Sequence, residues 1–359
     1  MKTPVPRRLW RSCGLAALAL SLPSVHAVIL YNSGNPAVNT TAPTGPLQDS
    51  GWQYANAFLG FNGYPISPDS FVVSKHIVGG YHQGVTGGAT FTYLGVNYTS
   101  VARYDEPNGG DLTVLKIDPL AAPGAFPSFV PLYRKNDEVG KDFVVLGRGV
   151  ERGTQVDIAS NGTTAASPNL TLRGWKAGGN PGTQRWGENQ VDSILTSTGP
   201  NPQYEFLYST FTPPSAGGLV NEAALAGGDS SGGVFIKDTD GIWKLAGLNS
   251  GVDSIFSTTS NGTAVLMALI DAGGLYDGAN PLQDTTNLDL AFGPDHQVSN
   301  LPPEQLFNLA GSHLVGGYHT RISNLSPWLD SVSVPESSTP TAVFGTALLA
   351  AACWTSRRK

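Results

Sequence analysis

A glycine-rich loop at residues 227–234, Gly-Gly-Asp-Ser-Ser-Gly-Gly-Val, carries the clearest chemical signal in the chain. A serine hydroxyl is a weak nucleophile, so it needs a base that takes its proton and donors that hold an oxyanion. Glycines on both sides allow a tight turn that aims the N–H groups of Gly228 and Ser230 at one point. We call residues 227–234 the serine loop and expect Ser230 to be a nucleophile, with Gly228 and Ser230 as its oxyanion hole. The alternative is a plain Gly/Ser loop between two strands.

The base should be a histidine, and His76 has the most suitable setting. It follows the apolar run at residues 71–74, and the end of a strand can hold an imidazole at the edge of a barrel. The third group should be a carboxylate that orients the imidazole, and Asp111 stands directly before the apolar run at residues 112–117. Taken singly, each residue has an ordinary alternative: a strand-end histidine for His76 and a turn residue for Asp111.

The order His76, Asp111, Ser230 resembles that of the trypsin-like serine peptidases of the chymotrypsin fold. The resemblance rests on Val-Ser-Lys-His at 73–76, Asp-Leu-Thr-Val-Leu at 111–115, Gly-Asp-Ser-Ser-Gly-Gly at 228–233, and the last strand and closing helix at 318–323 and 328–329. It covers about residues 54–333. It implies two packed antiparallel β-barrels with the site between them, and peptide hydrolysis through a His-Asp-Ser triad and an acyl-enzyme.

The serine loop departs from the family pattern at two positions. Ser231 replaces a glycine, and Gly233 replaces a proline. Because two glycines follow Ser231, this residue is the alternative nucleophile. Ser230 is preferred, since residues 228–229 and 234–235 then both align with the family pattern without a gap. The half-cystines of the family are also absent, as in some bacterial members.

The resemblance also implies where the substrate side chain binds. It places Ala224 at the base of the substrate pocket and Ser250 and Val252 on its wall, where Val252 replaces the usual glycine. An apolar floor without charge cannot pair with Lys or Arg. We therefore expect small or medium apolar side chains before the cleaved bond.

A second implication concerns Asp229, which precedes the nucleophile. In the resemblance this aspartate pairs with a freed α-amino group, and the pairing shapes the oxyanion loop. Cleavage after Ala27 would free Val28, which begins the apolar stretch Val-Ile-Leu. The alternative is that residues 28–30 form an ordinary edge strand and another group holds Asp229.

Short β-rich runs separated by turns predict an all-β fold. Hairpins are expected around the turns at 94–95 and 238–241, and long loops at 160–214 and 277–303, which are rich in Gly, Asn, Thr and Pro. The expected domain spans 28–333, with barrels at roughly 50–140 and 141–315 and a C-terminal helix at about 321–331.

Both ends of the chain have the character of targeting segments. Residues 1–27 combine a basic start, a short apolar core and the small-residue site Val-His-Ala, as in a signal peptide. Residues 334–359 carry Val-Pro-Glu-Ser, an apolar run and a basic terminus, which resembles the PEP-CTERM sorting tail of Gram-negative bacteria. That resemblance implies an exosortase-type partner, transient membrane contact, and release to the cell surface or medium. A plain C-terminal anchor helix is the alternative, although the apolar run is short.

Charge and cysteine content exclude several functions. Residues 28–333 carry 14 basic and 26 acidic side chains, a net charge of −12, which disfavours binding to nucleic acid. Cys13 and Cys353 both lie in the expected targeting segments, so a thiol nucleophile or a cysteine-based metal site is not expected. We expect no cofactor and no metal. The function predicted is an exported serine endopeptidase. The alternatives are a non-catalytic surface-binding protein on a peptidase scaffold and an esterase that uses the same triad.

Overall fold

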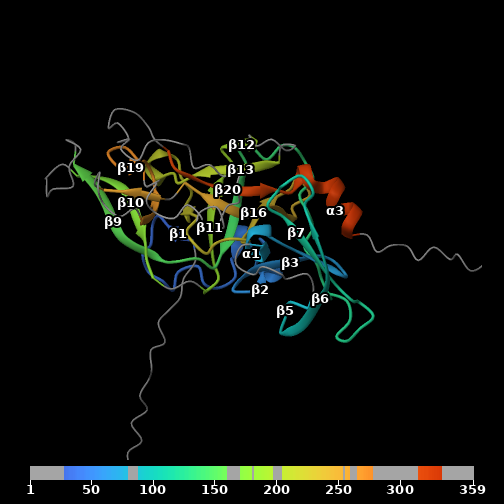
Figure 1. The fold of residues 1–359 in the computed structure, drawn as a ribbon. Helices are drawn as coiled ribbons and strands as arrows, with labels where there is room; N and C mark the ends of the chain where they lie inside the picture. The colour runs from blue at the N-terminus through green and yellow to red at the C-terminus, as the bar shows by residue number, and fades with distance from the viewer. Residues whose placement is uncertain are drawn as a thin grey trace, which may run out of the picture.

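The computed structural model describes residues 28–79, 88–159, 170–179, 182–196, 204–253, 255–258, 265–277 and 314–333. The expected signal peptide, the sorting tail and the loop expected after Asp277 lie outside them. The predicted all-β class with a short C-terminal helix is confirmed, because antiparallel strands dominate and the last element of the described residues is the helix α3, Ser326–Ser333 (Figure 1). Among the helices described, all are too short or too polar to span a bilayer.

The first sheet has six strands and curls into a nearly closed barrel. Its edge strands meet, because the rings of Phe58 and Phe91 lie 6.4 Å apart. The predicted hairpin at 94–95 is confirmed, and Leu94 and Gly95 both adopt positive φ, as a two-residue turn between twisted strands requires. In spatial order the strands are β2 (Asn56–Phe58), β3 (Phe61–Ser67), β4 (Ser70–Val73), β7 (Thr113–Ile117), β6 (Val96–Asp105) and β5 (Thr90–Tyr93).

The second sheet has seven antiparallel strands and includes the other predicted hairpin, which is confirmed. Its strand β20 lies beyond the expected barrel limit at 315 and extends through Arg321. The helix expected at about 321–331 therefore starts later, after the short 3-10 turn η4, Ser323–Leu325. In spatial order the strands are β11 (Arg185–Gln190), β8 (Asp142–Gly147), β15 (Gly233–Lys237), β16 (Trp243–Val252), β20 (Gly316–Arg321), β13 (Glu205–Thr210) and β12 (Ser193–Thr196).

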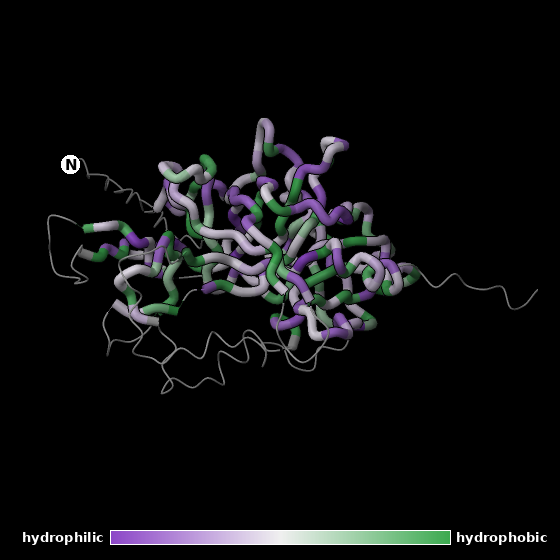
Figure 2. Tube along the Cα trace, turned by 90° about the horizontal axis from the view of Figure 1, so that it is seen from above, coloured by the Kyte–Doolittle hydropathy of each residue, from purple (hydrophilic) through white to green (hydrophobic). Residues whose placement is uncertain are grey.

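A third sheet was not expected from the sequence. The segment 160–214, predicted as long loops, contributes strands to the second and third sheets, so that prediction was wrong. The third sheet forms the end of the molecule opposite α3, and the view from above shows the same elongated outline (Figures 1 and 2). In spatial order its strands are β19 (Tyr276–Asp277), β17 (Ile255–Ser257), β18 (Val265–Leu269), β10 (Leu170–Ala177) and β9 (Arg152–Ala159).

The largest apolar cluster joins the first two sheets and so fixes how they sit against each other. Tyr64 and Val72 from the first sheet pack with Leu146 and Phe235 from the second, and α3 covers the cluster with Leu329. All five side chains are buried, and each is apolar or aromatic. Burial of this kind is the main stabilising term in folding. Loops that leave the two sheets along this junction are therefore held at fixed positions.

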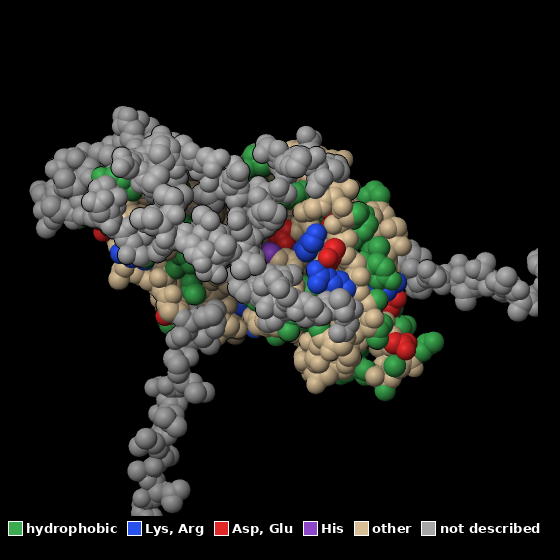
Figure 3. All heavy atoms as spheres, in the orientation of Figure 1, with side chains coloured by type: hydrophobic (Ala, Val, Ile, Leu, Met, Phe, Trp, Pro, Cys, Tyr) green, Lys and Arg blue, Asp and Glu red, His purple; other side chains and the backbone are tan. Residues whose placement is uncertain are grey.

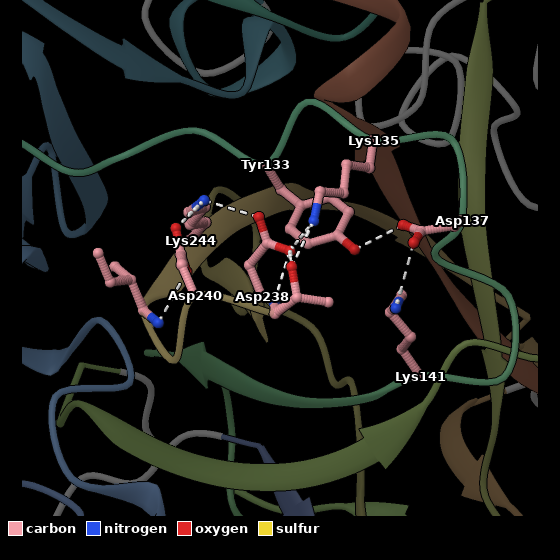
Figure 4. A network of polar contacts seen from close by, with 9 residues as sticks. Tyr133, Lys135, Asp137, Lys141, Asp238, Asp240 and Lys244 are labelled. Atoms are coloured by element: carbon pink, nitrogen blue, oxygen red, sulfur yellow. Dashed lines mark hydrogen bonds and ion pairs between the residues drawn. The ribbon is translucent and has the colours of Figure 1, made fainter.

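A polar network ties the segment between the first two sheets to the β15–β16 turn (Figure 4). The Tyr133 hydroxyl donates to Asp137 at 2.6 Å, and Lys135 and Lys244 both contact the carboxylate of Asp238. The two ammonium groups, that of Lys135 first, hold the pKa of Asp238 well below its usual range. The network lies at the surface and fixes the path of the chain as it passes from one sheet to the next.

Candidate active site

His76 and Asp111 are directly hydrogen-bonded. His76 was expected to end a strand, but β4 ends at Val73 and His76 lies in the short helix α1, Lys75–Gly79. Asp111 stands just before β7. Its Oδ2 lies 2.7 Å from Nδ1 of His76, and its Oδ1 accepts the His76 backbone N–H at 2.8 Å. Since Nδ1 faces a carboxylate, Nε2 is left as the ring nitrogen that can accept a proton.

Ser250 belongs to the same cluster. Its hydroxyl donates to Oδ2 of Asp111 at 2.6 Å, and the side chain is buried. The sequence assigned Ser250 to the wall of the substrate pocket and gave no signal for a contact with the acid. The Asp111 carboxylate thus accepts three hydrogen bonds, from the His76 ring, the His76 backbone and Ser250. These three bonds fix the orientation of the carboxylate.

The two adjacent serines have different surroundings. Ser231 is fully buried, and its Oγ donates to the Asn62 carbonyl at 2.7 Å and accepts the Ser74 N–H at 2.9 Å. Its hydroxyl proton is therefore committed to the protein interior. Ser230 is partly exposed, and no hydrogen bond of its hydroxyl is found within the described residues, including one to His76. Of the two, only Ser230 has a hydroxyl that a substrate can reach.

The serine loop and His76 are nevertheless tied to the same place. The bond between Ser74 N–H and Ser231 Oγ joins the residue two before His76 to the residue after Ser230. Gly228 adopts φ 90°, a conformation that L side chains rarely adopt. For the part of the chain described, neither the Gly228 nor the Ser230 N–H has a protein acceptor. Both donors expected to form an oxyanion hole are thus unpaired.

Asp229 is buried beneath the loop and accepts three backbone N–H bonds. Oδ1 accepts from Val28 at 3.1 Å and from Gly149 at 2.7 Å, and Oδ2 accepts from Ala226 at 2.8 Å. Burial raises the pKa of Asp229 to about 6, although the three N–H groups and the nearby Arg185 act in the opposite direction. The Val28 backbone N–H reaches Asp229, and β1 (Ile29–Leu30) pairs with β14 (Ala223–Ala224). The pairing of Asp229 with a freed α-amino group stays a prediction.

The residues assigned to the substrate pocket come from two different sheets. Ala224 lies in β14, and Val252, at the end of β16, pairs with Gly317 in β20. Leu225, which the sequence analysis did not single out, lies against Gly317, because a Cβ on that glycine would be 3.0 Å from the Leu225 side chain. Leu225 and Val252 belong to one apolar cluster. Ala224 packs against a second apolar cluster, so all three side chains have apolar neighbours.

The face seen in Figure 3 shows a histidine side chain at the surface beside acidic and basic side chains. Within the described ranges the histidines are His76 and His319; His319 is buried, and the His76 side chain is 8% exposed. No set of three His, Cys, Asp or Glu side chains in these ranges is arranged to hold a metal. A comparison with models of known protein families found no match, and no curated protein matches the chain.

Proposed function

We propose that this chain is a serine endopeptidase of the trypsin-like kind, with two packed β-barrels. The observation that carries the proposal is the hydrogen-bonded group of His76, Asp111 and Ser250 beside a loop with one accessible serine. A carboxylate that holds Nδ1 of an imidazole keeps Nε2 free to act as a base, and this arrangement is the recurring solution for activating serine.

The chemistry follows from these positions. Ser230 Oγ attacks the substrate carbonyl while Nε2 of His76 takes its proton, and Asp111 stabilises the imidazolium that forms. The N–H groups of Gly228 and Ser230 hold the oxyanion. His76 then gives the proton to the leaving amine, which departs and leaves an acyl-enzyme. Water, deprotonated by the same imidazole, hydrolyses this ester and restores Ser230.

Ser231 has a structural role in this proposal. Ser231 stands where the family pattern has a glycine, and its hydroxyl satisfies Asn62 and Ser74 inside the protein and leaves the loop surface to Ser230. The substitution is therefore compatible with catalysis. The apolar surroundings of Ala224, Leu225 and Val252 favour small or medium apolar side chains before the cleaved bond.

Covalent labelling tests the proposal. Protein expressed from Val28 is treated with a fluorophosphonate, the labelled residue is mapped by tandem mass spectrometry, and turnover is measured on matched peptide and ester substrates. Ser230→Ala should abolish labelling and turnover, while Ser215→Ala, a change at an exposed serine, should leave both unchanged. A label on Ser231 would refute the assignment of the nucleophile. A folded protein without label would indicate a binding function, and turnover of esters alone would indicate an esterase.

Export and surface sorting are part of the same proposal. The three-part pattern of residues 1–27 and the motif and apolar run of residues 334–359 support it. The direct test is mass spectrometry of the two ends of the protein recovered from the producing bacterium. Ends at Val28 and near residue 334 are expected, and an intact C-terminus in the membrane fraction would instead indicate an anchor helix.

A further inference from the structure

Asn249 lies in β16 directly before Ser250, is 1% exposed, and holds the serine loop through its backbone. Its N–H donates to the Gly232 carbonyl at 2.8 Å, and its carbonyl accepts the Ser231 N–H at 2.8 Å. The same carbonyl accepts the Ser74 hydroxyl at 3.0 Å. One residue thus contacts both the serine loop and the segment that leads into His76.

The side chain of Asn249 holds the loop as well. Its Nδ2 donates to the Asp229 carbonyl and to the Leu146 carbonyl, each at 3.0 Å. A Cβ on Gly232 would lie 2.4 Å from Nδ2, so only a glycine at 232 allows the amide to come this close. Both N–H groups of the amide therefore donate hydrogen bonds, one to Asp229, the residue before Ser230, and the other to Leu146 in β8.

His319 fixes the orientation of this amide. Its Nδ1 lies 2.8 Å from Oδ1 of Asn249, and its Nε2 lies 3.1 Å from the Ser209 hydroxyl. Burial lowers the pKa of His319 to about 3, so the ring is neutral at physiological pH. Because Oδ1 can only accept, Nδ1 must carry the proton and Nε2 must accept from Ser209. If the amide of Asn249 were flipped, its NH₂ group would face the Nδ1–H of His319, and two donors would oppose each other.

We propose that Asn249, oriented by His319, is a positioning residue that fixes the serine loop relative to His76 and Asp111; this inference rests on the proposed function. The next residue, Ser250, binds Asp111, so two consecutive residues of one strand connect the nucleophile side of the site to the acid and base side. Small displacements of reacting groups lower a catalytic rate steeply, and such a loss affects kcat more than KM.

The test compares two variants of His319 and one of Asn249 in protein that begins at Val28. Asn249→Leu, a change of similar volume, removes the amide; kcat should fall by about 10- to 100-fold with little change in KM. His319→Gln keeps a donor for Oδ1 of Asn249, whereas His319→Phe removes it. The Gln variant should retain most of the wild-type kcat and the Phe variant should lose about tenfold. The Phe variant leaves Asn249 in place, so it still tests the inference if Asn249→Leu does not fold.

A separate variant controls for a general loss of stability. Val156→Ala, a buried change in the third sheet, should lower the melting temperature without changing kcat. Equal kcat values for the Gln and Phe variants, or an unchanged kcat in folded Asn249→Leu, would overturn the inference while wild-type protein still labels at Ser230. Wild-type protein that is folded but does not label would overturn the proposed function itself, and the positioning role with it.

Discussion

Two extra residues ahead of Val28 should lower both the stability and the activity of the protein at pH 7. Asp229 is buried beneath the serine loop, and the Val28 nitrogen is one of its three N–H partners. While residue 27 is attached, that nitrogen is a neutral amide. When the chain begins at Val28, the nitrogen is an ammonium group that gives the buried carboxylate an opposite charge. A buried charge without a charged partner is costly, and its pairing reduces the cost.

The size of the effect follows from the pKa of Asp229. Burial against amide partners raises this pKa from 3.8 to about 6. The shift corresponds to a cost of about 3 kcal/mol for ionising the carboxyl in the folded protein. Because the pKa is higher in the folded protein, the protonated carboxyl contributes its full share of stability below pH 3.8, and this share is lost as pH rises through about 6. The extended protein should therefore be about 3 kcal/mol less stable at pH 7 than at pH 3.8 through this group alone. In the protein that begins at Val28, the ammonium lowers the pKa of Asp229 and removes this loss.

The backbone at Val28 adds to the same difference. Val28 has φ 31°, in a region that β-branched residues rarely adopt, and such a conformation costs roughly 1–3 kcal/mol. This torsion exists only while residue 27 is attached, so cleavage before Val28 removes the strain. Removal of residues 1–27 would then strengthen the contact beneath the serine loop without a separate activating cut.

The assay measures the free energy of unfolding in urea from pH 4 to 7 for both forms, together with kcat/KM. The two curves should differ by roughly 1–3 kcal/mol at low pH through the strain at Val28, and by about 3 kcal/mol more at pH 7. The extended form should also be less active. Asp229→Asn serves as the matched control. It should raise the free energy of unfolding of the extended form at pH 7 and lower that of the form that begins at Val28. Parallel pH curves with equal activity would refute the reasoning.

Three further predictions follow from the contacts of single residues. Ser231→Ala should keep fluorophosphonate labelling at Ser230 but lower the free energy of unfolding by about 2–4 kcal/mol, because Asn62 and Ser74 lose their buried partner; an unchanged urea midpoint would contradict this. A peptide library should show small or medium apolar side chains before the cleaved bond, and a profile dominated by Lys or Arg would contradict the assignment of Ala224. Glu138→Ala should cost about 2–3 kcal/mol in urea unfolding, because Arg321 loses its buried bidentate acceptor while Glu205 still pairs with the guanidinium; a loss below about 1 kcal/mol would show that solvent replaces Glu138.

The sequence alone predicted the elements whose signals are local. The Leu94-Gly95 turn between alternating runs predicts a hairpin, because the turn and the strand period are both set within a few residues. The side chains suited to nucleophilic chemistry were also found locally, since His76, Asp111 and Ser230 each stand beside a short apolar run. The third sheet was missed because β9 and β10 flank a stretch of loop-like composition, and because β10 pairs with the distant strand β18, where Gly174 lies opposite Leu269.

The tertiary structure supplied the physical difference between the two serines. Ser230 and Ser231 are neighbours with the same side chain, and the difference between them comes from Asn62 and Ser74, which lie more than 150 residues earlier. The contact of Ser250 with Asp111 likewise joins residues 139 positions apart. Such bonds form because two packed sheets bring distant backbone and hydroxyl groups into a space without water, where each group must find a partner in the protein. A local motif specifies which groups are present, whereas the packing of the sheets determines which groups are satisfied inside and which remain open to a substrate.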